Sequence, residues 1–419
     1  MNNLQNKIGN HRVDELAKCY QTPTFFYETE TIKERIKDVA RADVIRYAQK
    51  ACSNIAILKL VQQQGVKVDA VSAGEIFRAV TAGFQTGDGK SDIVYTADIF
   101  DDDAISLIKK YQIPVNVGSP DMLGQLGTFA PGSKVTLRIN PGFGHGHSEK
   151  VNTGGDLSKH GIWYKDIEEC LSLAKNAGLT VHGLHMHIGS GSDFKHLSKV
   201  CEAMVTHAKK VGPSLEVISA GGGLPIPYQK DKPRIDLNAY FDLWDKTKAD
   251  IAAAIKHDVQ LEIEPGRYLV AESCTLLTQI CSIKRMEENL FYLVNAGFDT
   301  LIRPAMYGAY HEISISPANT SECKEMQDVI VGGPLCESCD VFTQQEGGFV
   351  SNRLLPKAQV GDYLLIHDAG AYGAAMSSNY NSKRLAAEVL LTCDSHHLIR
   401  KRQTMEDLIK NEQIPDFLK

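Results

Sequence analysis

The chain has 419 residues, 43% of them hydrophobic and 23% charged, and its formal net charge at pH 7 is -6. This length suits two domains, or a barrel with a smaller companion, and the acidic balance argues against a nucleic-acid partner, which would require a basic face. No apolar run is long enough to cross a bilayer, and the N-terminus lacks the apolar core of a secretory signal. We therefore expect a cytoplasmic protein with no membrane partner.

Eight short apolar runs alternate with amphipathic helical patterns in the first two thirds of the chain. The clearest helix has Asp236 as its N-cap and places Phe241, Trp244 and Ile251 on one face. Eight strands alternating with helices predict a (β/α)8 barrel, an α/β fold. An open doubly wound sheet is the alternative, but no G-x-G-x-x-G follows the first strand. The predicted strands are residues 44–50, 66–72, 92–97, 114–118, 134–140, 181–189, 215–223 and 259–266.

A second domain is predicted after residue 268, where the helical alternation stops. Apolar strands separated by turns predict a mostly antiparallel β domain there. We place the barrel at residues 28–268 and build the second domain from residues 1–27 plus 269–419. Residues 22–28 (TPTFFYE) form a strand that pairs either with the barrel or with the second domain.

Two ionisable residues follow predicted barrel strands at their C-terminal ends, where barrel enzymes carry their active sites. Lys50 closes the first strand, and partial desolvation in the barrel mouth would make its neutral amine accessible for a Schiff base. Taken alone, it is as readily a surface lysine. Glu264 closes the eighth strand, where it would hold a cationic ring nitrogen or pair with Arg267 or Arg138.

Glycines and histidines occupy other strand ends. Gly221–Gly223 and Gly266 follow the last two strands, where this fold binds phosphate, although each is otherwise a plain turn. His185 and His187 share one face of the sixth strand and would bind a metal, stack on an aromatic cofactor, or be buried and hydrogen-bonded.

The second domain contributes two polar motifs. In GPLCESCD, Cys336 and Glu337 would supply a proton donor and a substrate contact, or else form a tight turn with a buried thiol. In RPAMYG, Arg303 and Tyr307 would clamp a carboxylate, or form a surface salt bridge. Because no second cysteine pair or histidine pair follows Cys336 and Cys339 at ligand spacing, we expect no metal site.

Together and in this order, these motifs resemble the fold-type III pyridoxal-phosphate decarboxylases, which act on ornithine, arginine or diaminopimelate. The resemblance covers nearly the whole chain and is closest to the bacterial diaminopimelate branch. It implies a barrel followed by a β-sandwich-like domain, pyridoxal 5'-phosphate as cofactor, and decarboxylation of meso-2,6-diaminopimelate to L-lysine. The motifs that carry it are YAQKACSN, DAVSAGE, HMHIGSG, GGGLPIPY, EPGR, RPAMYG, GPLCESCD and DAGAYG.

The same resemblance implies a role for individual residues. Lys50 matches the lysine that bonds to the cofactor, and Cys336 matches the catalytic proton donor, which the family takes from the partner subunit of a homodimer with shared active sites. The other implied cofactor contacts are His187, Ser190, Gly223, Glu264, Gly266, Arg267 and Tyr372. The implied substrate contacts are Arg267, Arg303, Tyr307, Glu337 and Tyr372.

One position departs from the family pattern, which usually reads C-E-S-G-D. Cys339 stands where the family has glycine, and a positive φ there would cost about 1–3 kcal/mol with a side chain.

Three other functions are compatible with parts of the sequence. A related decarboxylase of ornithine, arginine or a carboxylated polyamine is one, although Arg303 favours a substrate with a second carboxylate. A decayed enzyme that binds a partner protein is another, but such a chain would be expected to lose Lys50 or Cys336. A metal-dependent barrel hydrolase using His185 and His187 is the third, although those enzymes usually carry H-x-H on the first strand.

Overall fold

The computed structural model describes residues 3–87, 89–144, 154–187, 189, 193–318 and 325–419. The chain divides into two compact units. The barrel unit contains Ile32–Pro227 and Pro233–Leu269. The β unit combines three segments, Met1–Thr31, Tyr228–Lys232 and Val270–Lys419.

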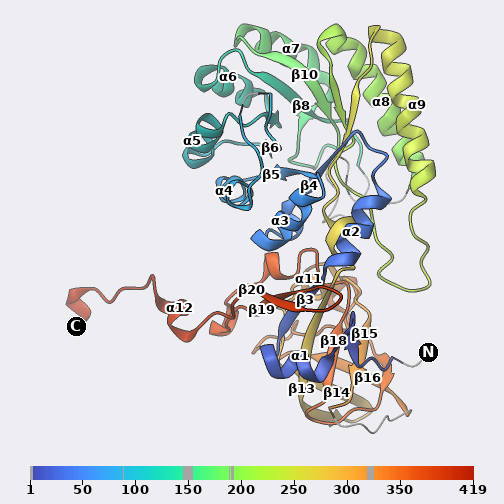
Figure 1. The fold of residues 1–419 in the computed structure, drawn as a ribbon, viewed down its shortest axis with the longest axis vertical. Coiled ribbons are helices and arrows are strands. Elements are labelled where there is room, and N and C mark those ends of the chain that lie inside the picture. The colour runs from blue at the N-terminus through green and yellow to red at the C-terminus, as the bar shows by residue number, and fades with distance from the viewer. Residues whose placement is uncertain (1–2, 88, 145–153, 188, 190–192, 319–324) are drawn as a thin grey trace. The chain divides into compact units, whose positions relative to one another are not determined.

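Eight parallel strands close on themselves in the barrel unit, which confirms the predicted (β/α)8 barrel (Figure 1). Closure comes from the pairing of the last strand with the first, Glu262 with Val44 and Ile263 with Ile45. The apolar runs are buried on nearly every residue, as expected for strands covered by helices. In order around the barrel, the strands are β4 (Val44–Ala48), β5 (Lys67–Ala70), β6 (Ile93–Ala97), β7 (Val115–Val117), β8 (Lys134–Asn140), β10 (Thr180–His185), β11 (Val217–Ser219) and β12 (Gln260–Ile263).

A helix follows each strand, and the predicted cap at Asp236 is present. The Asp236 side chain accepts a hydrogen bond from the backbone N–H of Ala239, and Phe241, Trp244 and Ile251 are buried. No helix in the described ranges is both long and apolar enough to cross a membrane. The helices are α2 (Thr29–Asp38) before the barrel, then α3 (Ile55–Gln63), α4 (Ala73–Ala82), α5 (Asp102–Tyr111), α6 (Pro120–Phe129), α7 (Ile167–Asn176), α8 (Phe194–Val211), α9 (Leu237–Ile255) and α10 (Arg267–Val270), and a short strand β9 (Ile162–Trp163) pairs with β8.

The β unit is built around the long strand β13 (Cys274–Met286), which pairs antiparallel with three other strands. Most of the pairings in this unit are antiparallel, as predicted. The remaining strands are β1 (Lys7–Ile8), β2 (His11–Arg12), β3 (Thr24–Glu28), β14 (Asn289–Val294), β15 (Ile313–Ser316), β16 (Met326–Gly332), β17 (Arg353–Pro356), β18 (Tyr363–Ile366), β19 (Ala387–Leu391) and β20 (His396–Arg400). Its helices are α1 (Val13–Tyr20), α11 (Arg303–Tyr307) and α12 (Met405–Ile409).

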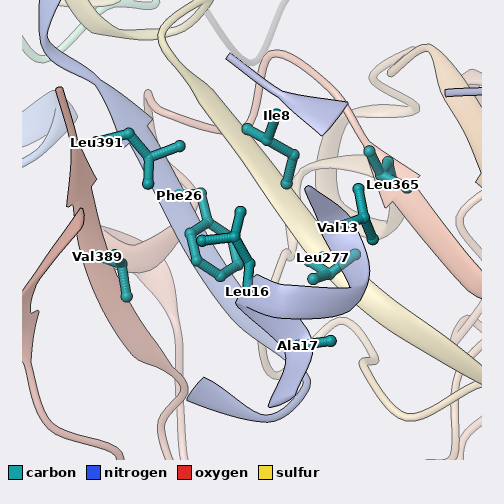
Figure 2. Packing of buried hydrophobic residues seen from close by; sticks show 9 residues of the cluster. All are labelled: Ile8, Val13, Leu16, Ala17, Phe26, Leu277, Leu365, Val389 and Leu391. Atoms are coloured by element: carbon teal, nitrogen blue, oxygen red, sulfur yellow. The ribbon is translucent and has the colours of Figure 1, made fainter. Parts of the chain in front are cut away.

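The N-terminal segment belongs to the core of the β unit. Strand β3 pairs antiparallel with β13 and parallel with β19, so the open choice for residues 22–28 is resolved in favour of this unit. The apolar side of α1 packs onto the same sheet (Figure 2). Each fully buried side chain of this size contributes about 1.5–3 kcal/mol, so the N-terminal residues stabilise a domain that lies mostly at the other end of the sequence. The cluster consists of Ile8, Val13, Leu16, Ala17, Phe26, Leu277, Leu365, Val389 and Leu391.

Candidate active site

Lys50 lies directly after β4, in a short 3-10 helix at Gln49–Ala51. Its side chain is exposed, which differs from the desolvated amine that we expected. The strand ends before Lys50, so the residue stands on the turn above the barrel and not within its packed interior. Its charge acts on the nearby Asp69 and His187, so Lys50 lies at the same end of the barrel as those groups.

Glu264 is buried just beyond β12 and is bound by one side chain from β10 and one from β11. Nε2 of His185 lies 2.8 Å from Oε2, and the Ser219 hydroxyl donates to Oε1 at 3.2 Å. Burial alone would raise the pKa of Glu264, but the charges and hydrogen bond of His185, together with His187 and Arg138, lower it to about 2. The carboxylate therefore stays ionised at neutral pH, as a partner of a protonated ring nitrogen must be.

Asp69 is a site residue at a predicted strand end to which the sequence assigned no role. It is buried at the end of β5, and burial followed by the neighbouring Glu264 charge raises its pKa to about 8, although Lys50 opposes the shift. Its atom Oδ1 has no hydrogen-bond partner among the described residues. The two buried carboxyl groups therefore differ in protonation state at neutral pH: Glu264 is ionised and Asp69 is protonated. The available signal was an acidic residue inside the apolar strand KVDA.

The pKa of Asp69 predicts how stability changes with pH. A carboxyl group whose pKa is higher in the folded chain than its unfolded value near 4 binds more protons when folded, so its contribution to stability falls as pH rises from about 4 to about 8. Asp69→Asn removes this pH-dependent loss of stability, because the asparagine side chain does not titrate. In thermal unfolding of the cofactor-free chain, we expect the Tm of the variant relative to the natural chain to rise steadily between pH 5 and pH 8.

The control for this prediction is Asp258→Asn, because Asp258 is exposed. Its Tm difference from the natural chain should not change with pH. A Tm difference for Asp69→Asn that is equally flat would show that Asp69 is already ionised in the folded chain.

His187 and the glycine turn after β11 pack tightly against each other. Burial, followed by the nearby charges of Lys50 and Arg138, lowers the pKa of His187 well below its usual value, so its ring is neutral. A Cβ atom on Gly221 would lie 2.6 Å from the Cβ of His187, and one on Gly223 would lie 2.4 Å from the carbonyl oxygen of Gly189. The φ angles of these glycines are +62° and +106°, so space and backbone conformation both require glycine.

Gly266 and Arg267 complete the barrel end. A Cβ on Gly266 would lie 3.0 Å from the carbonyl oxygen of Ala48, which immediately precedes the Lys50 turn. Arg267 begins α10. Ser190, the remaining predicted contact in this unit, lies outside the described residues.

These barrel residues are suited to pyridoxal phosphate. One end of the barrel carries a primary amine, an ionised buried carboxylate, a neutral imidazole and glycine turns whose backbone can approach an anion closely. The described residues contain no group of three or more metal-ligating side chains. His185, one of the two candidate metal ligands, instead binds Glu264.

In the β unit, Cys336 and Glu337 are exposed on the turn that follows β16. Asn381 Oδ1 accepts a hydrogen bond from the backbone N–H of Cys336 at 2.9 Å. Asp340 accepts one from Leu335 at 2.7 Å and, through its other oxygen, one from Phe298 at 2.8 Å. Asn381 and Asp340, which the sequence did not single out, therefore fix the turn that presents the thiol.

Cys339 carries no backbone strain. It is not among the described residues with positive φ, so the cost considered for a side chain at this position does not arise.

Arg303, Tyr307 and Tyr372 also belong to the β unit. Arg303 is buried at the start of α11, and Tyr307 is half-buried at the end of the same helix. Tyr372 has φ +59°, which is costly for a residue with a side chain and is typical of functional positions.

The fold and these residues define a class of protein, the pyridoxal-dependent decarboxylases. Residues 29–271 match the pyridoxal-binding domain of that family, so the chain belongs to it. Within the family, the chain is similar over nearly its whole length to diaminopimelate decarboxylases.

Those relatives cover nearly the whole chain. The diaminopimelate decarboxylase of Escherichia coli is 52% identical over 392 residues, 93% of each chain, and that of Streptomyces coelicolor is 48% identical over 98% of this chain and 94% of its own. A crystal structure of diaminopimelate decarboxylase is 49% identical, with a TM-score of 0.94 over 98% of this chain and 99% of its own. A diaminopimelate decarboxylase from M. jannaschii in co-complex with L-lysine is 30% identical, with a TM-score of 0.87 over both full chains.

Proposed function

We propose that this pyridoxal-phosphate enzyme converts meso-2,6-diaminopimelate to L-lysine and carbon dioxide, the last step of lysine biosynthesis, in the cytoplasm. The observation that carries the chemistry is the buried, ionised Glu264 at the barrel end that also carries Lys50. The substrate assignment is supported by relatives of that name at 48–52% identity.

The barrel residues would hold the cofactor. Lys50 would bond to it, the ionised Glu264 would keep a proton on its ring nitrogen, and the neutral ring of His187 would pack against its ring. Gly223, Gly266 and Arg267 would contact its phosphate, and Ser190 is the further phosphate contact that the family resemblance implies. When bound, pyridoxal phosphate supplies an electron sink for the charge that departing carbon dioxide leaves behind.

The residues of the β unit would select the substrate and finish the reaction. Arg303, Tyr307 and Glu337, together with Arg267 of the barrel unit, would hold the amino-acid end that does not react, and Tyr372 would contact both cofactor and substrate. Cys336 donates the proton that replaces the lost carboxylate on carbon. In our proposal Cys336 and Glu337 come from the second subunit of a homodimer, which agrees with their exposure on a fixed turn.

A subunit-mixing experiment tests the shared sites. Lys50→Ala and Cys336→Ala are each expected to be inactive, because each lacks one essential group in every site. Random exchange makes half of the dimers hybrid, and each hybrid regains one complete site of its two, so activity should recover to about a quarter of that of the unmixed natural enzyme. Each variant exchanged with itself is the control. No recovery despite hybrids detected by mass would place Lys50 and Cys336 of one chain in the same site.

The substrate is tested by measuring lysine and carbon dioxide release from meso-diaminopimelate, ornithine and arginine, with cofactor and a reductant present. Arg303 favours a substrate with a second carboxylate, so only diaminopimelate should turn over. Preference for ornithine or arginine would keep the chemistry and refute the substrate.

A further inference from the structure

Arg303 lies in an environment that holds its guanidinium in one orientation. It is 5% exposed, and its atom Nη1 lies 2.8 Å from Nε2 of His311. The ring of Tyr228 lies below the guanidinium, with its centroid 4.6 Å from the guanidinium carbon. The Tyr228 ring also meets His311 edge to face, at 5.5 Å between centroids. His311 therefore accepts a hydrogen bond from an N–H of the guanidinium, and Tyr228 covers one face of it.

The partners of His311 determine its protonation state. Since an arginine only donates hydrogen bonds, Nε2 of His311 must accept from Arg303 and carries no proton. Its other nitrogen, Nδ1, lies 2.8 Å from the carbonyl oxygen of His367 and must donate to it. His311 is 2% exposed, and both bonds require the neutral ring with its proton on Nδ1. Such an acceptor orients the guanidinium without placing a negative charge beside it.

We infer that His311 is a positioning residue, which fixes Arg303 for the carboxylate that the reaction retains. This inference rests on the proposed function and deepens it. Because the product is L-lysine, the carboxylate lost from meso-diaminopimelate is that of the D centre, and the one retained is that of the L centre. A guanidinium held in one plane binds such a carboxylate through two parallel hydrogen bonds, whereas a mobile one loses affinity on being ordered.

The product and its decarboxylated counterpart provide a matched pair of probes. L-lysine carries the retained carboxylate, and cadaverine is the same molecule without it. Binding of each to the holoenzyme is measured by titration calorimetry, so the readout does not depend on turnover. The natural enzyme should prefer L-lysine, and the ratio of the two dissociation constants measures what Arg303 contributes.

The test variants are His311→Leu, which removes both hydrogen bonds, and His311→Gln, whose side-chain oxygen can occupy the position of Nε2. We expect His311→Leu to weaken L-lysine binding by about tenfold or more, the effect of losing a hydrogen bond to a charged group, with cadaverine binding unchanged. His311→Gln should restore most of the preference. His397→Leu, at an exposed histidine of β20 in the same unit, is the control and should bind both as the natural enzyme does.

The outcomes separate the two proposals. If the natural enzyme does not bind L-lysine in preference to cadaverine, the assigned substrate fails. If it does, and His311→Leu keeps the preference or loses affinity for both probes equally, the positioning role is refuted. Should His311→Leu fail to fold, His311→Asn replaces it, because its side chain is one carbon shorter than that of Gln and does not reach Arg303. Equal preferences in His311→Asn and His311→Gln would then overturn the inference.

Discussion

Lys50→Ala is expected to lower kcat on meso-diaminopimelate by at least about a thousandfold, or about 4 kcal/mol of transition-state stabilisation. The physical reason is that this amine is the only proposed covalent attachment for the cofactor at the barrel end. Because Lys50 is exposed on a turn and does not pack in the core, the substitution should leave folding intact. Steady-state kinetics measure the loss of turnover, and the absorption spectrum of the purified protein measures the loss of the covalently attached cofactor.

The matched control for Lys50→Ala is Lys59→Ala. Lys59 is an exposed lysine on the neighbouring helix α3, where it donates a hydrogen bond to Gln62. It should keep full activity and the full cofactor spectrum. Turnover by Lys50→Ala within tenfold of the natural rate would contradict the role of Lys50.

Glu264→Gln is expected to lower kcat by about a hundredfold or more, equivalent to about 2.7 kcal/mol. The amide has the same shape but no charge, so it cannot keep a proton on the ring nitrogen, while its oxygen can still accept from Ser219 or His185. The loss should therefore appear in kcat with little change in KM or in the amount of cofactor bound. Kinetics at neutral pH, where the natural carboxylate is ionised, measure it.

Glu216→Gln is the control for this charge removal. Glu216 lies in the same unit and forms an ion pair with Lys134 at the surface, and exposed pairs of this kind contribute little. Its kcat should be unchanged. If Glu264→Gln kept a natural kcat with cofactor bound, the ring-nitrogen partner would have to be another group.

The barrel was predictable because its signal is local. Each of its eight strands is a short apolar run followed by a helix, and all eight runs overlap an observed strand. Most observed strands are shorter than predicted. The polar residues at the ends of the predicted runs lie in loops and are not part of the hydrogen-bonded sheet. The short segment Tyr228–Lys232 belongs to the β unit although the chain before and after it belongs to the barrel unit. No local sequence pattern predicts this assignment.

The partners of the site residues were not predictable, because tertiary folding brings them together. His185 and Glu264 are 79 residues apart, and Cys336 and Asn381 are 45 apart. Nothing in the local sequence pairs them. Asp69 illustrates the same limit, since its raised pKa depends on burial and on the Glu264 charge from another strand. The motifs indicated which residues are reactive, whereas the structure shows which neighbours set their charge and orientation.

The most direct test of the central claim is the stoichiometry of the reaction itself. Purified enzyme with pyridoxal phosphate and meso-diaminopimelate should release one carbon dioxide for each L-lysine formed, and Lys50→Ala should release neither. Carbon dioxide release from ornithine or arginine but not from diaminopimelate would contradict the substrate. A natural chain that turns over none of these substrates, even when loaded with cofactor, would contradict the account as a whole.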